Sequence, residues 1–296
     1  METSNPAGQK PQWLRKKVSL NNENIAAVKD LLVDLNLNTV CQSAKCPNIF
    51  ECFSKKTATF MLLGDKCTRN CAFCGVDSAN PLPPDKNEPL NIAIAVKELS
   101  LQYIVLTSVT RDDIKDGGAI QFAETVKQIK KEMPGAIVEC LVPDFRGMTE
   151  NLKILLDANP DVLNHNVETV KNNYKKIRSG ASYKRSLDLL KSSKKLRPDI
   201  ITKSGFMLGL GESIKEIKEL LSDLSDSKVD IVTIGQYLRP SAKNHPVIKY
   251  YSPDEFSQIE EISKDFAFKY VVSGTFVRSS YQASAAYNAI KAGYIK

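Results

Sequence analysis

The chain has 296 residues, of which 42% are hydrophobic and 25% charged, and its 41 Lys and Arg against 34 Asp and Glu give a formal net charge of +7. This composition excludes wholesale disorder and fibrous repeats, and the length suits one large domain or two modest ones. No stretch approaches the roughly 18 consecutive apolar residues that a membrane helix needs. The first seventeen residues lack the apolar segment of a secretory signal, so we expect a cytoplasmic protein without membrane association.

Six of the seven cysteines lie between positions 41 and 74, on either side of the first predicted strand, 57–63. They form two groups of three: Cys41, Cys46 and Cys52 in a C-x4-C-x5-C pattern, and Cys67, Cys71 and Cys74 in a C-x3-C-x2-C pattern. In an intracellular protein, such density indicates metal or redox chemistry rather than a disulfide framework. The seventh, Cys140, lies in an apolar predicted strand and is expected to be a buried structural thiol.

Each cysteine group supplies three thiols, whereas a structural zinc site usually takes four protein ligands from paired knuckles. Three thiolates on a [4Fe–4S] cluster leave one iron without cysteine, and a substrate, a cofactor or another side chain can bind there. Two alternatives remain for the second group: a zinc site, or buried small side chains on one face of a helix. Gly64 and Gly75 at its two ends and the polar residues within it favour a loop over a helix.

After the first cysteine group, apolar β-rich segments alternate with segments of helical periodicity. The predicted strands are 57–63, 102–107, 136–142, 161–167, 200–208 and 229–235. The predicted helices are 89–100, 118–133, 149–158, 167–178, 182–196, 212–226 and 253–266. Repeated strand and helix units indicate a parallel α/β array, and no G-x-G-x-x-G motif follows the first strand to support a dinucleotide-binding sheet. We therefore predict a partial (β/α)6 barrel over 57–266, with an N-terminal extension (1–56) and a C-terminal extension (267–296) packed on it as one unit.

In such a barrel the functional residues lie on the loops that follow the strands. Ser108 follows the second predicted strand and Asn166 lies at the end of the fourth, so both are candidates for cofactor binding. The segment from Lys171 to Arg197 contains ten Lys and Arg against one acid, Asp188. We interpret it as a docking face for an acidic protein, with a plain solvated helix surface as the alternative; it lacks the interleaved aromatic residues that bind nucleic acid.

The second cysteine pattern is similar to the signature of radical S-adenosylmethionine (SAM) enzymes, and the first resembles that of the lipoyl synthase family in particular. Further matching segments run in order from about residue 11 to residue 283: CPNIFEC, LTSVTRDDIKDGGA, LVPDFRG, NHNVETV, RSGASYKRSL, TKSGFMLGLGE, QYLRPS and RSSY. Thr110 departs from the family pattern, which commonly has an acid at that position. The resemblance implies a radical-SAM barrel and a sulfur-inserting transferase.

The resemblance also implies two [4Fe–4S] clusters and SAM as cofactors. Cys67, Cys71 and Cys74 would hold the reducing cluster, whose open iron binds SAM, with Ser108 and Asn166 near the cofactor. Cys41, Cys46 and Cys52 would hold an auxiliary cluster, with Ser280 of RSSY as the fourth ligand and Ser279 as the second choice. The alternative for these serines is an N-cap of the following helix. The auxiliary cluster would give its sulfides to C6 and C8 of a protein-bound octanoyl group.

The partners implied are octanoylated lipoyl carrier domains, namely the E2 subunits of 2-oxoacid dehydrogenases and the H protein of glycine cleavage. The resemblance also implies an electron donor, such as ferredoxin or flavodoxin, and an iron–sulfur carrier that rebuilds the auxiliary cluster. We expect no nucleic acid partner. A different sulfur-inserting radical enzyme, resembling biotin synthase, is the alternative function.

Overall fold

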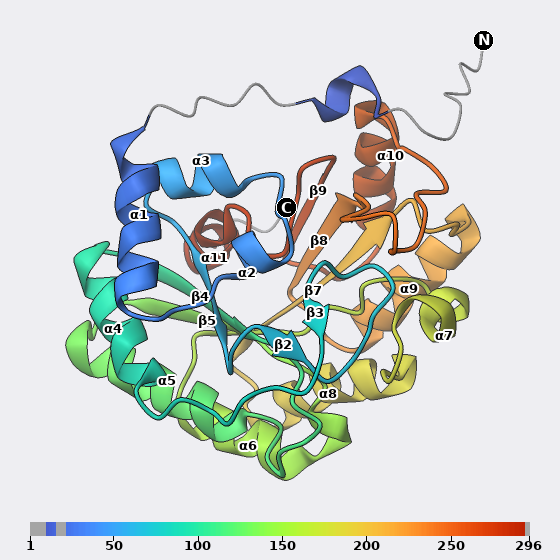
Figure 1. The fold of residues 1–296 in the computed structure, drawn as a ribbon. Coiled ribbons are helices and arrows are strands. Elements are labelled where there is room, and N and C mark those ends of the chain that lie inside the picture. The colour runs from blue at the N-terminus through green and yellow to red at the C-terminus, as the bar shows by residue number, and fades with distance from the viewer. Residues whose placement is uncertain (1–9, 16–21, 294–296) are drawn as a thin grey trace.

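A computed structural model describes residues 10–15 and 22–293 of the chain (Figure 1). Most of the first seventeen residues, on which the expectation about a signal sequence depends, lie outside these ranges. Within the two described ranges, no helix combines the length and the apolar composition that crossing a bilayer requires.

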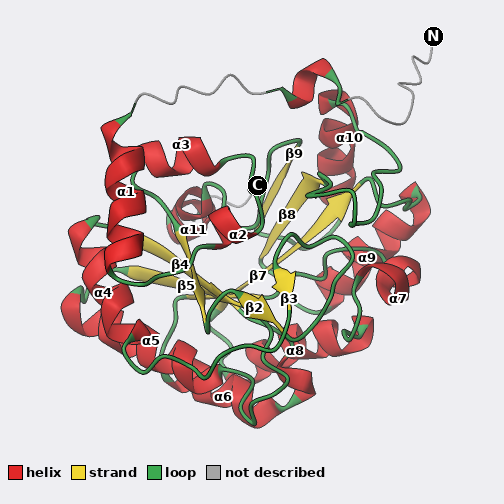
Figure 2. Cartoon of the chain, in the orientation of Figure 1, coloured by secondary structure: helices red, strands yellow, loops and turns green. Residues whose placement is uncertain are grey.

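One parallel sheet of seven strands forms the centre of the molecule, and its strands are ordered β1-β4-β5-β6-β7-β8-β9. The strands are β1 (Thr59–Leu62), β4 (Tyr103–Ser108), β5 (Ile137–Leu141), β6 (Val162–Asn164), β7 (Ile201–Leu208), β8 (Ile231–Gln236) and β9 (Tyr270–Gly274). Figure 2 shows the strands curving around a centre with helices outside them. Because β1 and β9 are the two ends of this order, the sheet is a barrel left open between them.

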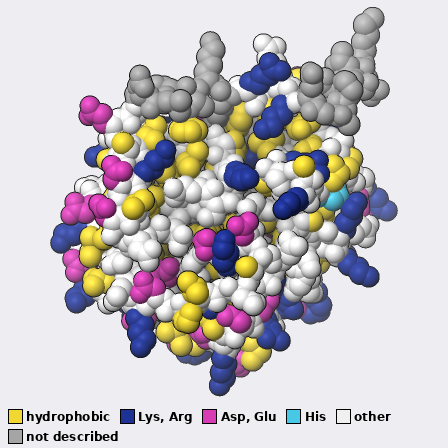
Figure 3. Space-filling model, viewed as in Figure 1, with side chains coloured by type: hydrophobic (Ala, Val, Ile, Leu, Met, Phe, Trp, Pro, Cys, Tyr) yellow, Lys and Arg dark blue, Asp and Glu magenta, His cyan; other side chains and the backbone are white. Residues whose placement is uncertain are grey.

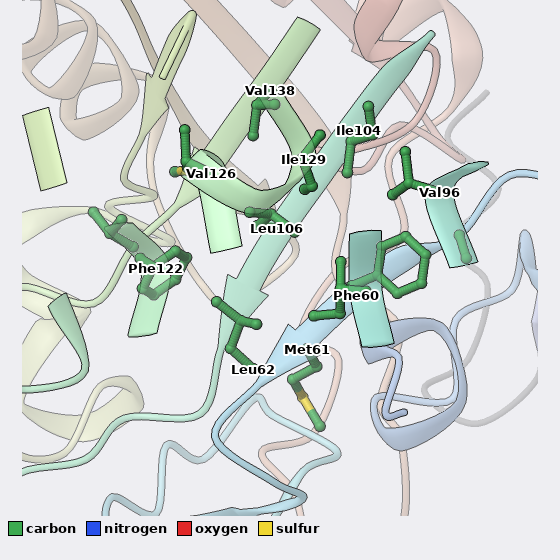
Figure 4. Packing of buried hydrophobic residues seen from close by; sticks show 14 of the residues in the cluster. Phe60, Met61, Leu62, Val96, Ile104, Leu106, Phe122, Val126, Ile129 and Val138 are labelled. Atoms are coloured by element: carbon green, nitrogen blue, oxygen red, sulfur yellow. The ribbon is translucent and has the colours of Figure 1, made fainter. Parts of the chain in front are cut away.

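Helices on the outer face return the chain from each strand to the next. They are α4 (Glu88–Glu98), α5 (Ala119–Glu132), α6 (Thr149–Asp157), α8 (Tyr183–Leu196), α9 (Ile214–Asp226) and α10 (Pro253–Ser263). Capping boxes begin α9 and α10, where Ser213 pairs with Glu216 and Ser252 with Glu255. The core lies between sheet and helices, where Phe60 of β1, Leu106 of β4 and Phe122 of α5 belong to one cluster of buried apolar side chains (Figure 4). Each such buried side chain stabilises the fold by about 1.5–3 kcal/mol.

All six predicted strands are present, and each is followed by helix before the next strand of the seven-stranded sheet, which confirms the six βα units. A further strand, β9, lies in the segment predicted as the C-terminal extension and pairs in parallel with β8 from Ile231↔Tyr270 to Gly235↔Gly274. The apolar run after α10 therefore continues the sheet instead of leaving it.

The helix predicted over 167–178 is wrong in its first part. The Glu168 backbone instead pairs with β7, since Glu168 N–H donates to Gly205 O (2.9 Å) and Met207 N–H donates to Glu168 O (2.9 Å). Glu168 also has a φ of 67°, which ends any right-handed helix there. Only a 3-10 turn, η3 (Lys171–Asn173), and one helical turn, α7 (Tyr174–Ile177), remain.

The two extensions pack on the barrel and meet each other. The N-terminal one contributes η1 (Gln12–Leu14), α1 (Glu23–Asp34), α2 (Val40–Ser43) and α3 (Ile49–Ser54), and the C-terminal one ends in α11 (Ala283–Lys291). Tyr287 of α11 packs with Val162, Ile201 and Ile231, each the first residue of its strand. Helix α11 therefore covers the amino ends of the strands, which leaves the carboxyl ends for the site.

Candidate active site

A cavity of about 610 Å³ lies at the carboxyl ends of the strands, between the barrel and the two extensions. The structure brings every candidate site residue to its wall: Cys41, Cys46, Cys52, Cys67, Cys71, Cys74, Ser108, Asn166, Ser279 and Ser280. Cys140 is not among the lining residues, because it is fully buried within β5. Burial raises the pKa of its thiol well above the ordinary value, as suits a structural side chain.

The second cysteine group lies on the loop that follows β1, around two short strands, β2 (Lys66–Cys67) and β3 (Asp77–Ser78). Backbone amides point at its sulfurs: Cys67 Sγ accepts from Arg69 N–H (3.4 Å) and Thr110 N–H (3.3 Å), and Cys74 Sγ accepts from Val76 N–H (3.4 Å). Hydrogen bonds of this kind stabilise cluster thiolates and tune their potential. Thr110, where the family pattern has an acid, contributes through its backbone.

A buried ion network fixes the same loop. Arg69 donates to Asp112 from Nε (2.7 Å) and to Asp144 from Nη2 (2.8 Å), and Arg185 Nε also donates to Asp144 (2.8 Å). Although burial opposes it, the Arg69 guanidinium holds the pKa of Asp144 well below its usual value. Because removing one partner of a buried ion pair costs about 3–5 kcal/mol, the network constrains the loop between Cys67 and Cys71.

Burial raises the pKa of the Cys41 and Cys71 thiols to about 11 and that of Cys74 to about 12. The Arg178 guanidinium opposes this shift at Cys71. Thiols with such values are protonated at neutral pH, so metal loading must displace their protons. The donors suit an iron–sulfur cluster, because thiolates are soft ligands that bind such clusters as well as zinc and copper(I).

The first cysteine group lies on α2, on α3 and between them, beside the C-terminal RSSY segment. Asn48 Nδ2 donates to Phe276 O (2.8 Å), and Tyr281 Oη donates to Glu51 Oε1 (2.9 Å). Burial lowers the pKa of Arg278, and the nearby thiol of Cys46 opposes that shift. The two hydrogen bonds thus bring the RSSY serines to the cavity wall near the first group.

Neither serine caps the following helix. The N-cap of α11 is Gln282, which lies two residues beyond Ser280. The helix-cap alternative for Ser279 and Ser280 is therefore wrong, and both half-buried side chains line the cavity instead.

Over the described ranges, no three or more His, Cys, Asp or Glu side chains converge closely enough to hold a single metal ion. Each thiolate of a [4Fe–4S] cluster binds a different iron, so its cysteines surround a larger body. Three soft thiols on the wall of a cavity are suitable ligands for such a body, and each cysteine group supplies three.

Two orphaned polar atoms mark a second part of the cavity. Within the described part of the chain, Ser108 Oγ and Asn166 Oδ1 are buried and have no hydrogen-bond partner. Beside Asn166, a Cβ at Gly205 would come within 2.4 Å of Thr233 Oγ1 and 3.1 Å of Asn166 Oδ1, so only glycine leaves this space open. Buried polar atoms are nearly always bonded, so these atoms fit a polar ligand that occupies the space beside them.

The cavity wall also has charged residues that were not predicted from the sequence, among them Glu168, Arg178 and Arg278. Burial raises the pKa of Glu168, while Arg178 and the amide of Asn166, whose Nδ2 donates to Glu168 Oε1 (3.1 Å), oppose the shift. The position of Glu168 just beyond a strand end was the available signal for it. It was concealed because the segment was predicted as a helix.

The basic segment from Lys171 to Arg197 does not form one uniform face. Four of its charges have internal roles: Arg178 lines the cavity, Arg185 binds Asp144, Lys194 binds Asp230 (2.5 Å), and Arg197 Nη1 donates to Pro160 O (2.9 Å). Lys175 and Lys176 are exposed on α7, at the cavity end of the barrel, whereas Lys191 and Lys195 are exposed on α8 toward the opposite end.

Comparison with known proteins places the chain in a family. Residues 61–224 match the model of the Radical SAM superfamily. The chain is 53% identical over 275 residues to a lipoyl synthase of Caldicellulosiruptor saccharolyticus, which covers 93% of this chain and 96% of the relative. It is 49% identical over 291 residues to a lipoyl synthase of Koribacter versatilis, covering 98% and 95% of the two chains.

Solved structures share the fold at low sequence identity. Methylornithine synthase (PylB) is 16% identical with a TM-score of 0.55, and the match covers 88% of each chain. HydG, a maturase of the [FeFe]-hydrogenase, is 15% identical with a TM-score of 0.57, covering 84% of this chain and 62% of that one. A [4Fe–4S] cluster and SAM are the cofactors of the superfamily whose model matches. The chain is therefore an enzyme that belongs to the lipoyl synthase family of the radical SAM superfamily.

Proposed function

We propose that the chain inserts two sulfur atoms, at C6 and C8 of an octanoyl group on a carrier protein, and that an auxiliary [4Fe–4S] cluster is their source. One observation carries the proposal: both cysteine groups and the RSSY serines line a single cavity. A reducing cluster and a sulfur donor held in one cavity can act on the same substrate without releasing a reactive intermediate.

Cys67, Cys71 and Cys74 hold the reducing cluster in this proposal. When bound, the cluster and SAM would supply the one-electron radical chemistry needed to break an unactivated C–H bond. The chain's own residues bind and orient SAM. Arg178 pairs with the SAM carboxylate, and the orphaned Ser108 Oγ and Asn166 Oδ1 bond its polar groups.

Cys41, Cys46 and Cys52 hold the auxiliary cluster, with Ser280 as its fourth ligand. A hydroxyl oxygen is a harder ligand than a thiolate and suits iron in such a cluster less well, so the iron that it binds should be released more readily. That property suits a cluster which is consumed as a sulfur source. The contacts from Asn48 to Phe276 and from Tyr281 to Glu51 support the assignment, since they fasten RSSY beside this cysteine group.

We expect Ser280→Ala to lower the iron bound at the auxiliary site and to abolish sulfur insertion, because the fourth iron loses its protein ligand. SAM cleavage should continue, since the second cysteine group is untouched. Ser279→Ala is the matched control, because Ser279 is also half-buried and also lines the cavity. Iron and sulfide counts per chain, with product analysis, make the measurement. A Ser280→Ala chain with full auxiliary iron and full activity contradicts the assignment.

The substrates are octanoylated lipoyl carriers, namely E2 subunits of 2-oxoacid dehydrogenases and the glycine cleavage H protein. A ferredoxin or flavodoxin supplies electrons, an iron–sulfur carrier rebuilds the auxiliary cluster, and the reaction takes place in the cytoplasm. Lys175 and Lys176, exposed at the cavity end of the barrel, are suited to attract an acidic carrier. In Figure 3, Lys and Arg predominate on the right half, where Figure 1 places α7, whereas the left half has both acidic and basic side chains.

Reversing both α7 charges, with Lys175→Glu and Lys176→Glu, should lower kcat/KM for the carrier about tenfold at low salt. The deficit should shrink as salt increases, because exposed charges are screened. Lys191→Glu with Lys195→Glu makes the same charge change at the far end of the barrel and should leave kcat/KM nearly unchanged. Equal effects of the two pairs would argue against carrier docking at α7.

The proposed reaction is tested by incubating cluster-loaded protein with an octanoylated carrier, SAM and a reductant, followed by mass spectrometry of the carrier. The expected product contains two added sulfur atoms, at C6 and C8. A carrier that is unchanged, or sulfur placed at other carbons, would refute the proposal.

A further inference from the structure

A chain of buried polar side chains lies behind the cavity wall, and the proposed function uses only its first member, Arg178. It begins at Arg178, whose Nη1 donates to the Tyr174 hydroxyl and to Ser186 Oγ (3.1 Å). Ser186 Oγ lies 2.7 Å from Tyr174 Oη and 2.9 Å from His165 Nε2. The chain ends where His165 Nδ1 lies 2.8 Å from Val142 O. His165 and Ser186 are fully buried, and Tyr174 nearly so.

The donors and acceptors allow only one direction for this chain of hydrogen bonds. A backbone carbonyl can only accept, so His165 Nδ1 donates to Val142 O. Burial lowers the pKa of His165 to about 3, so the ring is neutral at physiological pH and Nε2 accepts. Ser186 must then donate to His165, and its oxygen accepts from Tyr174 and Arg178. The guanidinium at one end can only donate, and the carbonyl at the other end can only accept. Together they fix the direction in which each hydroxyl between them donates its hydrogen bond.

This chain restrains the side chain of Arg178. A free arginine side chain carries about 2 kcal/mol of rotamer entropy, which is lost when the guanidinium is held in one orientation. Here the guanidinium carbon also lies 5.4 Å from the centre of the Tyr174 ring, over its face. The backbone beside it is tied to the cysteine loop, because Ala72 N–H donates to Ile177 O (2.9 Å). Arg178 is therefore set in place relative to the second cysteine group.

We propose that His165, Ser186 and Tyr174 are positioning residues that hold the Arg178 guanidinium in the orientation in which it binds the carboxylate of SAM. The inference rests on the role of Arg178 in the proposed function. Substituting any of the three residues should then weaken the binding of a ligand only if the ligand has a carboxylate and only if Arg178 is present. A purely structural role does not predict this selectivity.

Tyr174→Phe tests this because it keeps the ring and removes one hydroxyl. We expect the variant to bind SAM about tenfold more weakly, since a hydrogen bond to a charged group is lost. Binding of 5′-deoxyadenosine, which has no carboxylate, should be unchanged. The measurement is the equilibrium Kd of each ligand for cluster-loaded protein. Ser186→Ala should show the same selectivity, and it serves as the second variant if Tyr174→Phe does not fold.

Tyr183→Phe is the matched control. Tyr183 is also buried and packs edge-to-face on Tyr174 at 5.3 Å, but its hydroxyl donates to Asp223 Oδ2 (2.8 Å), away from this chain. Removing the Tyr183 hydroxyl should lower the midpoint temperature of thermal unfolding about as much as Tyr174→Phe does. It should leave the Kd values for SAM and for 5′-deoxyadenosine unchanged. Weaker SAM binding in Tyr183→Phe equal to that in Tyr174→Phe would show a general packing effect and overturn the inference.

Arg178→Gln distinguishes the role of Arg178 in SAM binding from the positioning role of the residues behind it. If Arg178→Gln leaves the Kd for SAM unchanged, the proposed role of Arg178 fails. If Arg178→Gln weakens SAM binding, Tyr174→Phe should add nothing in that background, because the guanidinium that it positions is gone. Full additivity of the two substitutions, or no effect of Tyr174→Phe alone, overturns the positioning role and leaves that of Arg178 intact.

Discussion

Replacing Cys71 with alanine should abolish reductive cleavage of SAM and remove about four irons per chain. Cys71 lines the cavity on a loop that amides and a buried ion network already hold in shape. The loop should therefore persist without the thiol, while two cysteines alone leave half of the cluster irons without a protein ligand. Iron analysis and 5′-deoxyadenosine formation with a strong reductant measure the effect.

Cys140→Ala is the control for this substitution. It removes the same thiol from a fully buried site outside the cavity, at a stability cost on the order of 1 kcal/mol. The Cys140→Ala chain should keep its iron and cleave SAM normally. A Cys71→Ala chain that retains all its iron and still forms 5′-deoxyadenosine would show that the second cysteine group does not hold the reducing cluster.

Replacing Cys46 with alanine should separate the two halves of the reaction. Cys46 belongs to the group beside RSSY, and its thiol lies close enough to Arg278 to affect the pKa of that guanidinium. We expect the variant to lose about half of its iron and all sulfur insertion while it continues to cleave SAM. The variant should therefore form 5′-deoxyadenosine without forming any sulfur-containing carrier, because SAM cleavage is no longer coupled to sulfur insertion.

The comparison with Cys71→Ala makes the test of Cys46→Ala specific. Both substitutions remove one cavity thiol, yet only Cys71→Ala should stop SAM cleavage. If Cys46→Ala also stops cleavage, the two cysteine groups act as one site. If Cys46→Ala still yields sulfur-containing carrier, the first group does not hold the sulfur source.

The barrel was predictable from sequence because buried parallel strands are continuous apolar runs, and six of them alternate with helical periods. The sequence shows an apolar run at β9. It does not show that this run joins the sheet, because the partner strand β8 is separated from it in the chain by α10. The segment around Glu168 was predicted as a helix because its extended form depends on two hydrogen bonds to β7, and local periodicity does not contain that information.

The candidate site was predictable where its residues carry their own chemistry, as the cysteines do. Arg69, Glu168 and Arg178 were not found, because a charged side chain has no distinctive spacing, and some contacts of the site join residues that lie far apart in sequence, as those of Arg69 to Asp112 and Asp144 do. The bond from Tyr281 to Glu51, for example, spans 230 residues. The sequence also does not tell which charges of the basic segment are free for docking, since Arg185 and Lys194 bind acids that only the fold brings near.

The most direct test of the account is a single turnover of protein whose clusters were reconstituted with heavy-isotope sulfide. The protein is freed of excess sulfide and mixed with octanoylated carrier, SAM and a reductant, and the carrier is analysed by mass spectrometry. We expect two heavy sulfur atoms in each product and loss of one auxiliary cluster for each product formed. Product that carries sulfur of natural isotopic composition, or an auxiliary cluster that remains intact after turnover, would contradict the account.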